Sequence, residues 1–258
     1  MINYLTMFSL YFANITTVVL PIFIVVFGLI RKKLDIVRLL MGMFIFLVLN
    51  LFIMNPLLNF ISLMFGDNPL LAQTAFTIPL SVLIISLIDV YGRKFSFKYL
   101  LPNTHSNKEV SSIAIGIGTG EVLFSMGMMM FTNLSYALKI NNGTIYDILS
   151  VADAETVISN AQAATADTIL YYAFTAIFVI VVNVILTYLL VREKNNNDRR
   201  YVLFALAMLI VFNALIYILP MYGQFVLSII VTFIYCGLLI YVAKIKNLFN
   251  IEVKQVIK

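Results

Sequence analysis

Residues 201–220 read YVLFALAMLIVFNALIYILP, a run of 20 amino acids in which no side chain is charged. The hydrocarbon core of a membrane is crossed by about 20 mostly apolar residues in a helix that rises about 1.5 Å per residue. The stretch therefore predicts a transmembrane helix. Six similarly apolar stretches occupy 9–30, 37–58, 70–91, 110–137, 165–191 and 223–243. We expect an all-α, polytopic membrane protein with about seven transmembrane helices.

The overall composition supports this interpretation. Of the 258 residues, 62% are hydrophobic and 11% are charged, whereas a soluble domain is about one quarter charged. Seven helices of about 20 residues account for most of the chain, so we expect residues 1–258 to form a single integral membrane domain. Few Trp and Cys residues and many Ile, Asn and Lys residues are typical of an AT-rich bacterial genome. We therefore expect a multi-pass protein of the bacterial plasma membrane, surrounded by membrane lipid.

The basic residues predict the orientation of the chain. Sixteen of the 17 Lys and Arg residues lie in alternate gaps between the apolar stretches or, for Arg38, at the very start of the stretch that follows such a gap, and only Lys139 lies in a gap of the other set. The sixteen are Arg31, Lys32, Lys33, Arg38, Arg93, Lys94, Lys98, Lys108, Arg192, Lys194, Arg199, Arg200, Lys244, Lys246, Lys254 and Lys258. Because cytoplasmic loops collect Lys and Arg, we expect the N-terminus outside and the C-terminus in the cytoplasm. The net charge of +5 then reflects topology, and no nucleic-acid partner is expected.

The longest connection, residues 139–164, is predicted to lie outside the cell. Apolar residues recur there among polar neighbours at spacings that favour a short amphipathic helix. They are Ile145, Ile148, Leu149, Val151 and Val157. Such a helix could cap the bundle or could dock a partner.

Two acidic residues within the predicted transmembrane stretches stand out, Asp89 and Glu121, whereas Asp167 lies only two residues from the outer end of the stretch 165–191. Asp89 precedes Arg93 by one helical turn near the cytoplasmic end, where an i,i+4 ion pair is a sufficient explanation. Glu121 lies roughly 18 Å from the cytoplasmic end of its helix, close to the centre of the bilayer. A carboxylate at that depth costs several kcal/mol and suggests a functional site. The alternative is a neutral Glu121 hydrogen-bonded to a neighbouring helix.

Small and polar residues surround Glu121 in sequence and in predicted depth. Gly116 and Gly120 are spaced four apart, which allows another helix to approach closely. Other polar side chains at a similar depth could form one layer with Glu121, and these are Thr119, Asn183 and Asn213, with Tyr217 one turn beyond Asn213. Each of them taken alone could equally be an ordinary interhelical hydrogen bond.

Several of these landmarks resemble one family. The run Asp89-Val90-Tyr91-Gly92-Arg93, a basic turn, and then Gly116-Ile117-Gly118-Thr119-Gly120-Glu121 resembles the YhfC family of intramembrane peptidases, which are relatives of the CAAX-processing proteases. Leu20-Pro21 and Asn213-Ala214-Leu215-Ile216-Tyr217 extend the resemblance over most of the chain. The resemblance implies the helical membrane fold of those proteases.

The catalytic residues of that family are replaced here. Asp89 and Val90 stand where the family has paired glutamates, and Thr119, Asn183 and Asn213 stand where it has histidines. Tyr217 stands where the family has an aspartate after the last of those histidines. The chain has one histidine, His105, in a predicted cytoplasmic loop, whereas a catalytic zinc needs about three protein ligands. We therefore expect no catalytic residues, no metal and no cofactor.

These observations predict a catalytically degenerate pseudo-peptidase that acts as a non-enzymatic membrane subunit or receptor. It would bind a hydrophobic peptide, a lipid-like ligand or the transmembrane helix of a membrane-protein partner, with an ABC-type exporter as one possible setting by analogy. Two other functions stay open. One is an active intramembrane protease with a rearranged site at Glu121 and Asp89, and the other is a small transporter in which Glu121 carries a proton or cation.

Overall fold

A computed structural model describes residues 1–65, 74–101 and 106–249, and within these ranges the regular elements are helices. The α-helices are α1 (Tyr4–Asn14), α2 (Leu20–Ile30), α3 (Ile36–Leu47), α4 (Asn55–Phe65), α5 (Thr74–Tyr99), α6 (Asn107–Glu121), α7 (Met128–Asn141), α8 (Val151–Ala163), α9 (Ala166–Asn196), α10 (Arg200–Met221) and α11 (Phe225–Ile245). The prediction of an all-α protein is confirmed.

Three short π-helical segments join consecutive helices without a break. They are η1 (Ile15–Val19) between α1 and α2, η2 (Val48–Met54) between α3 and α4, and η3 (Val122–Gly127) between α6 and α7. Prolines explain two of them. Pro21 and Pro56 have no backbone N–H and would clash with the carbonyl groups of residues 17 and 52, and both of those residues lie in a π segment, where the hydrogen-bonding pattern is shifted.

Six helices within the described residues are long and apolar enough to cross a membrane. They are Tyr4–Ile30, Ile36–Phe60, Asn107–Asn141, Ala166–Asn196, Arg200–Met221 and Phe225–Ile245. The chain is therefore a multi-pass membrane protein. The remaining predicted stretch, 70–91, begins outside the described residues and corresponds to α5, which is not among these six.

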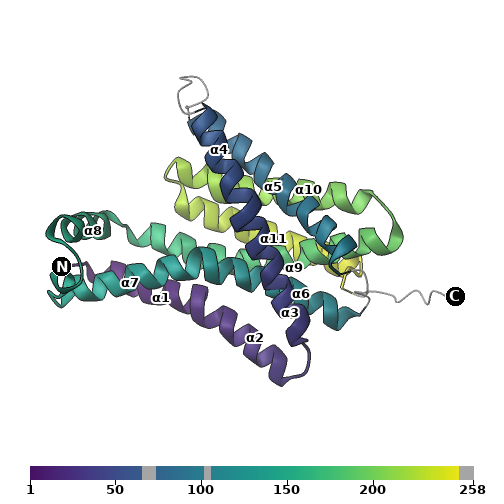
Figure 1. Cartoon of the computed structure of the whole chain (residues 1–258), viewed down its shortest axis with the longest axis horizontal. Coiled ribbons are helices and arrows are strands. Elements are labelled where there is room, and N and C mark those ends of the chain that lie inside the picture. The colour runs from purple at the N-terminus through teal and green to yellow at the C-terminus, as the bar shows by residue number, and fades with distance from the viewer. Residues whose placement is uncertain (66–73, 102–105, 250–258) are drawn as a thin grey trace.

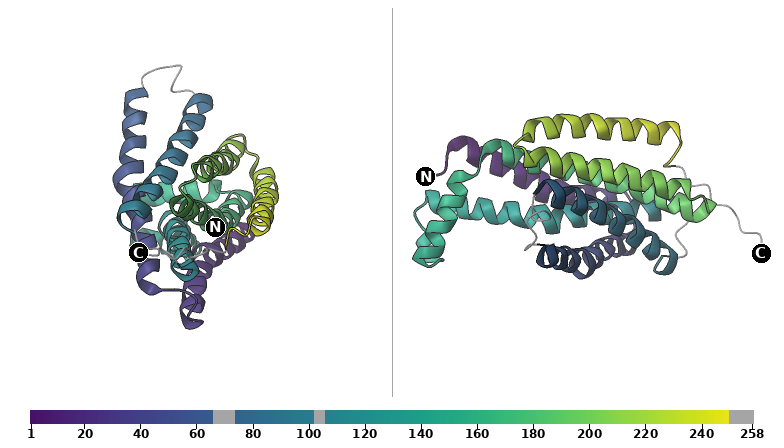
Figure 2. Two further views of the ribbon diagram at one scale, coloured as in Figure 1. Left: turned by 90° about the vertical axis from the view of Figure 1, so that its right-hand side faces the viewer. Right: turned by 90° about the horizontal axis from the view of Figure 1, so that it is seen from above.

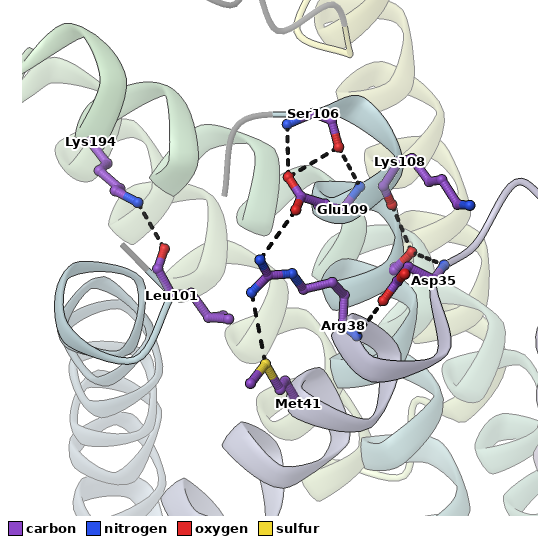
Figure 3. Close-up of polar contacts among 9 residues, drawn as sticks. Asp35, Arg38, Met41, Leu101, Ser106, Lys108, Glu109 and Lys194 are labelled. Carbon is purple, nitrogen blue, oxygen red and sulfur yellow. Dashed lines mark hydrogen bonds and ion pairs between the residues drawn. The ribbon is translucent and has the colours of Figure 1, made fainter. Parts of the chain in front are cut away.

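Helix α5 continues to Tyr99, beyond the predicted end at residue 91. Two polar contacts join this end of α5 and the residue Leu101 that follows it to α9. Lys94 forms an ion pair with Glu193 at 2.8 Å, and Lys194 donates a hydrogen bond to the Leu101 carbonyl at 2.8 Å (Figure 3). These contacts fix the last turns of α5 against α9.

Helix α9 forms the centre of the bundle. In the most apolar 18-residue segment of α9, 78% of the residues are buried, whereas the corresponding value for α11 is 22%. Helix α9 contacts α1, α5, α6, α10 and α11. The N-terminus and α8 lie at one end of the long axis, and the turn between α9 and α10 lies at the opposite end (Figure 1). The C-terminal end of α4 and the N-terminal end of α5 project away from the rest of the bundle (Figure 2), whereas the remainder of α5 packs against α9 and α10.

Polar contacts secure the helix starts at the end predicted to be cytoplasmic (Figure 3). Ser106 and Glu109 form a reciprocal capping box that begins α6. The Asp35 side chain accepts a hydrogen bond from the Arg38 backbone at the start of α3. Arg38 in turn forms an ion pair with Glu109 at 3.2 Å, which ties α3 to α6.

Helices α3 and α6 are in backbone contact. A Cβ atom added at Gly116 would lie 2.1 Å from the Leu39 carbonyl oxygen, and one added at Gly42 would lie 2.3 Å from the Ile113 carbonyl oxygen. Gly120 lies against Met43. The glycine stripe of α6 therefore lies against α3.

The connection 139–164 contains a short 3₁₀ turn (Ile145–Asp147) followed by α8. Ser150 caps α8 by accepting a hydrogen bond from the Asp153 backbone. Ile145 is buried, whereas Ile148 and Val151 are exposed, so the apolar residues of this connection do not all face the bundle.

Candidate functional site

A cavity of about 120 Å³ lies between η2, α5, α9, α10 and the junction of α6 with η3. Five of the residues singled out from sequence line it, and these are Asp89, Glu121, Asn183, Asn213 and Tyr217. The other lining residues are Phe46, Leu49, Asn50, Met54, Ile85, Ser125, Met126, Val179, Val182, Leu209, Phe212 and Ile216. The walls are therefore mainly apolar, with polar groups supplied by several helices.

Glu121 and Asn183 join α6 to α9 at the wall of this cavity. The Asn183 amide donates from Nδ2 to Glu121 Oε2 at 2.9 Å and to the Val179 carbonyl at 2.8 Å. The Asn183 Oδ1 atom is buried and has no hydrogen-bond partner in the described part of the chain. A Cβ atom added at Gly118 would lie 3.1 Å from Ile180 Cα, so a glycine at this position lets α9 approach closely enough for the Asn183–Glu121 contact.

Asp89 and Arg93 form the ion pair that their spacing predicts. Arg93 donates from Nε to Asp89 Oδ1 at 2.7 Å and from Nη2 to Oδ2 at 2.6 Å. The Arg93 side chain is 1% exposed and that of Asp89 is 17% exposed. Both carboxylate oxygens of Asp89 therefore face a cation that is almost fully buried.

Asn213 brings α10 into contact with α5. Its Nδ2 atom donates to Ser86 Oγ at 3.0 Å, and the Ser86 hydroxyl donates to the Val82 carbonyl at 2.7 Å. Tyr217, one turn along α10, is 46% exposed and lies at the mouth of the cavity, together with the exposed Ser125.

Thr119 does not belong to this group. It is fully buried but does not line the cavity, and its hydroxyl donates to the Ile115 carbonyl at 2.7 Å. The reason is helical geometry, because residues two apart point to different sides of a helix. Although Thr119 was predicted to lie at a similar depth to Glu121, its side chain does not reach the cavity.

Three polar residues near the cavity were not singled out from sequence. Asn50 and Ser125 line it, and Ser86 contacts Asn213. Asn50 lies in η2 and Ser125 in η3, and such π segments occur frequently at functional sites. The sequence signal that could have identified these residues is a polar side chain within an apolar stretch. The sequence alone does not tell towards which neighbouring helix such a side chain points.

The residues of the cavity do not fit a catalytic zinc ion. Such an ion takes three His, Cys or carboxylate ligands and keeps one open position. The cavity offers Asp89 and Glu121, and both oxygens of Asp89 already accept hydrogen bonds from Arg93. Among the described residues no group of three or more His, Cys, Asp or Glu side chains could hold a metal. His105 lies outside those residues.

The model of the YhfC intramembrane metalloprotease family matches residues 16–236. The match includes every residue that lines the cavity. No curated protein and no solved structure matches the chain.

Proposed function

We propose, from the premise that this chain belongs to the YhfC intramembrane metalloprotease family, that it is a catalytically degenerate member that binds rather than cleaves. It acts as a membrane subunit or receptor, and its binding site is the cavity at Glu121. One observation carries the proposal. The two carboxylates in this cavity are held by Arg93 and by Asn183, and the lining residues include neither His nor Cys.

The shape of the cavity suggests the kind of ligand. A volume of about 120 Å³ is well below the roughly 300–1,000 Å³ of sites that enclose a small molecule. It suits a single side chain of a longer apolar polypeptide that lies across the mouth between Ser125 and Tyr217. The buried Asn183 Oδ1 atom is an acceptor for a hydrogen-bond donor on that side chain. The ligand is therefore a hydrophobic peptide or a partner's transmembrane helix.

Site-specific photocrosslinking in the native host tests binding. A photoreactive amino acid is placed at Tyr217, at Ser125 and, as a matched control, at Phe233 on α11, which is 68% exposed. We expect one defined polypeptide adduct at the first two positions and none at the third. Glu121→Leu should remove this adduct, because it removes the hydrogen-bonding partner of Asn183. The same adducts at all three positions, or adducts insensitive to Glu121→Leu, would contradict the proposal.

An active protease that uses Glu121 and Asp89 is the second candidate, and family membership alone favours it. Proteoliposomes containing the purified protein, with and without added zinc, can be given membrane-spanning reporter peptides. The binding proposal predicts the same absence of cleavage products for wild type and Glu121→Gln. Cleavage by wild type that disappears in Glu121→Gln would establish the enzyme instead.

A further inference from the structure

A second cavity, of about 410 Å³, lies at the end of the bundle where α9 and α11 end and α10 begins. Its volume is within the range of sites that enclose small ligands. The cavity at Glu121 is smaller, and the two share no lining residue. The distribution of the basic residues along the chain predicts that this end of the bundle lies at the cytoplasmic surface of the membrane.

Each of the three helices changes from apolar to charged along this cavity. Leu189 on α9 is followed by Arg192, Leu239 on α11 is followed by Lys246, and Phe204 on α10 is preceded by Arg200. The apolar residues lie deeper in the membrane-spanning segments, and the cations lie at the helix ends. The lining of the cavity therefore changes from apolar to charged in the same direction as a phospholipid leaflet does, from the membrane interior to its surface.

The apolar part is both deep and open to the bilayer. Leu189 and Ala243 are buried at 3% exposure and form its floor, whereas Phe204 and Val242 are 45% and 40% exposed at its sides. An acyl chain could enter between α10 and α11, past these two half-exposed residues, and cover the floor.

The polar part carries more positive than negative charge. Arg192, Arg200 and Lys246 line it, against the single acid Asp198. Two hydrogen bonds lower the pKa of Asp198, and the one from the Arg200 side chain has a larger effect than the one from the Arg200 backbone. This carboxylate is therefore ionised at neutral pH. Asp198 contacts the backbone N and the Nε atom of Arg200, at 3.0 and 3.1 Å. The three cations and the one acid give the side chains that line the cavity a net charge of +2.

We propose that this cavity binds one anionic glycerophospholipid of the inner leaflet, with its phosphate between Arg200 and Lys246 and an acyl chain along Leu189, Phe204 and Val242. Charge complementarity selects an anionic headgroup, because basic pockets between transmembrane helices on the cytoplasmic side attract such lipids. The apolar floor distinguishes a lipid from a free phosphate ion.

Native mass spectrometry of the full-length protein, released from vesicles of phosphatidylcholine with 30% phosphatidylglycerol, tests the proposal. We expect one phosphatidylglycerol to be retained in preference to phosphatidylcholine. Arg200→Gln and Lys246→Gln should each weaken retention about fivefold, and the double variant about 25-fold. Lys33→Gln, which removes a cation outside this cavity, should leave retention unchanged.

A second variant separates a built site from general surface attraction. Ala243→Leu adds bulk to the cavity floor without changing charge, and it should displace the lipid while the melting temperature confirms that the protein is folded. Equal retention of both lipids, or phosphatidylglycerol retention unaffected in the double variant and in Ala243→Leu, would overturn the proposal. Displacement of the lipid by equimolar glycerol 3-phosphate would also overturn it, by showing a simple phosphate site.

Discussion

Asn183 on α9 donates a hydrogen bond to Glu121 on α6 over 2.9 Å, which brings together two polar side chains 62 positions apart in the sequence. The contact lies at the wall of an intramembrane cavity that Asp89, Asn213 and Tyr217 also line. It shows how Glu121 is held in place in a cavity whose lining residues include no histidine. The amide supplies the hydrogen-bond donor.

We expect Glu121→Leu to destabilise the protein and Glu121→Gln to have little effect. Leucine offers no acceptor to Asn183 Nδ2, whereas glutamine retains a carbonyl oxygen at the same position. Interhelical hydrogen bonds in membranes contribute about 1 kcal/mol, so this is the expected loss for the leucine variant. The free energy of unfolding can be measured by steric trapping in bilayer discs. A larger loss for the glutamine variant would show that the carboxylate charge, rather than the hydrogen bond, stabilises this site.

The glycine stripe of α6 gives a second prediction. Gly116→Ala places a Cβ atom 2.1 Å from the Leu39 carbonyl oxygen, so α3 and α6 must separate. Overpacking of this kind typically costs about 1–3 kcal/mol, which should appear as a lower melting temperature in detergent. The matched control is Gly237→Ala on α11, where no atom lies within 4 Å of the added Cβ. That change should leave stability equal or slightly higher, because alanine is the better helix former. Equal effects at the two positions would argue against backbone contact between α3 and α6.

Removing one partner of the Asp89–Arg93 pair should lower the free energy of unfolding more than removing both partners. Arg93→Leu leaves the Asp89 carboxylate, 17% exposed, without its cation, and removing one partner of a buried pair costs about 3 kcal/mol. The double variant Asp89→Leu/Arg93→Leu should recover part of this loss, because it leaves no unpaired charge. The exposed pair Asp198–Arg200, where the Arg200 side chain is 90% exposed, is the control, and Asp198→Ala should change stability little. A double variant less stable than Arg93→Leu would show that the pair itself is strongly stabilising.

Single-cysteine labelling tests the topology. The native Cys236 is buried and can be replaced by alanine to give a cysteine-free background. A membrane-impermeant thiol reagent should reach Leu63→Cys and Asn142→Cys from outside, and Lys33→Cys and Lys98→Cys only after the inner face is opened. Leu63 and Lys98 lie towards the ends of α4 and α5, so they report whether α5 crosses the membrane. If Leu63→Cys and Lys98→Cys were labelled from the same side, α5 would not cross the membrane. The crossings would then be the six helices of sufficient length and apolar character.

The sequence by itself determined the features that depend on local interactions. Long uncharged stretches such as 201–220 predict membrane helices because an apolar run of that length has no better environment than a bilayer. The Asp89–Arg93 contact was also predictable, because side chains four apart on a helix are neighbours whatever the rest of the chain does. Family membership followed from short motifs in their order along the chain.

Only the tertiary structure decided which polar residues meet. Glu121 on α6 and Asn183 on α9 meet at 2.9 Å, because that outcome depends on how each helix is rotated about its axis. The three π segments change this rotation. An extra residue in one turn rotates all that follows by about 100°, so the positions of Asn50 and Ser125 relative to Glu121 could not be derived from a regular helical repeat. The sequence contains the polar side chains of this site, and the crossing of the helices determines which of them face each other.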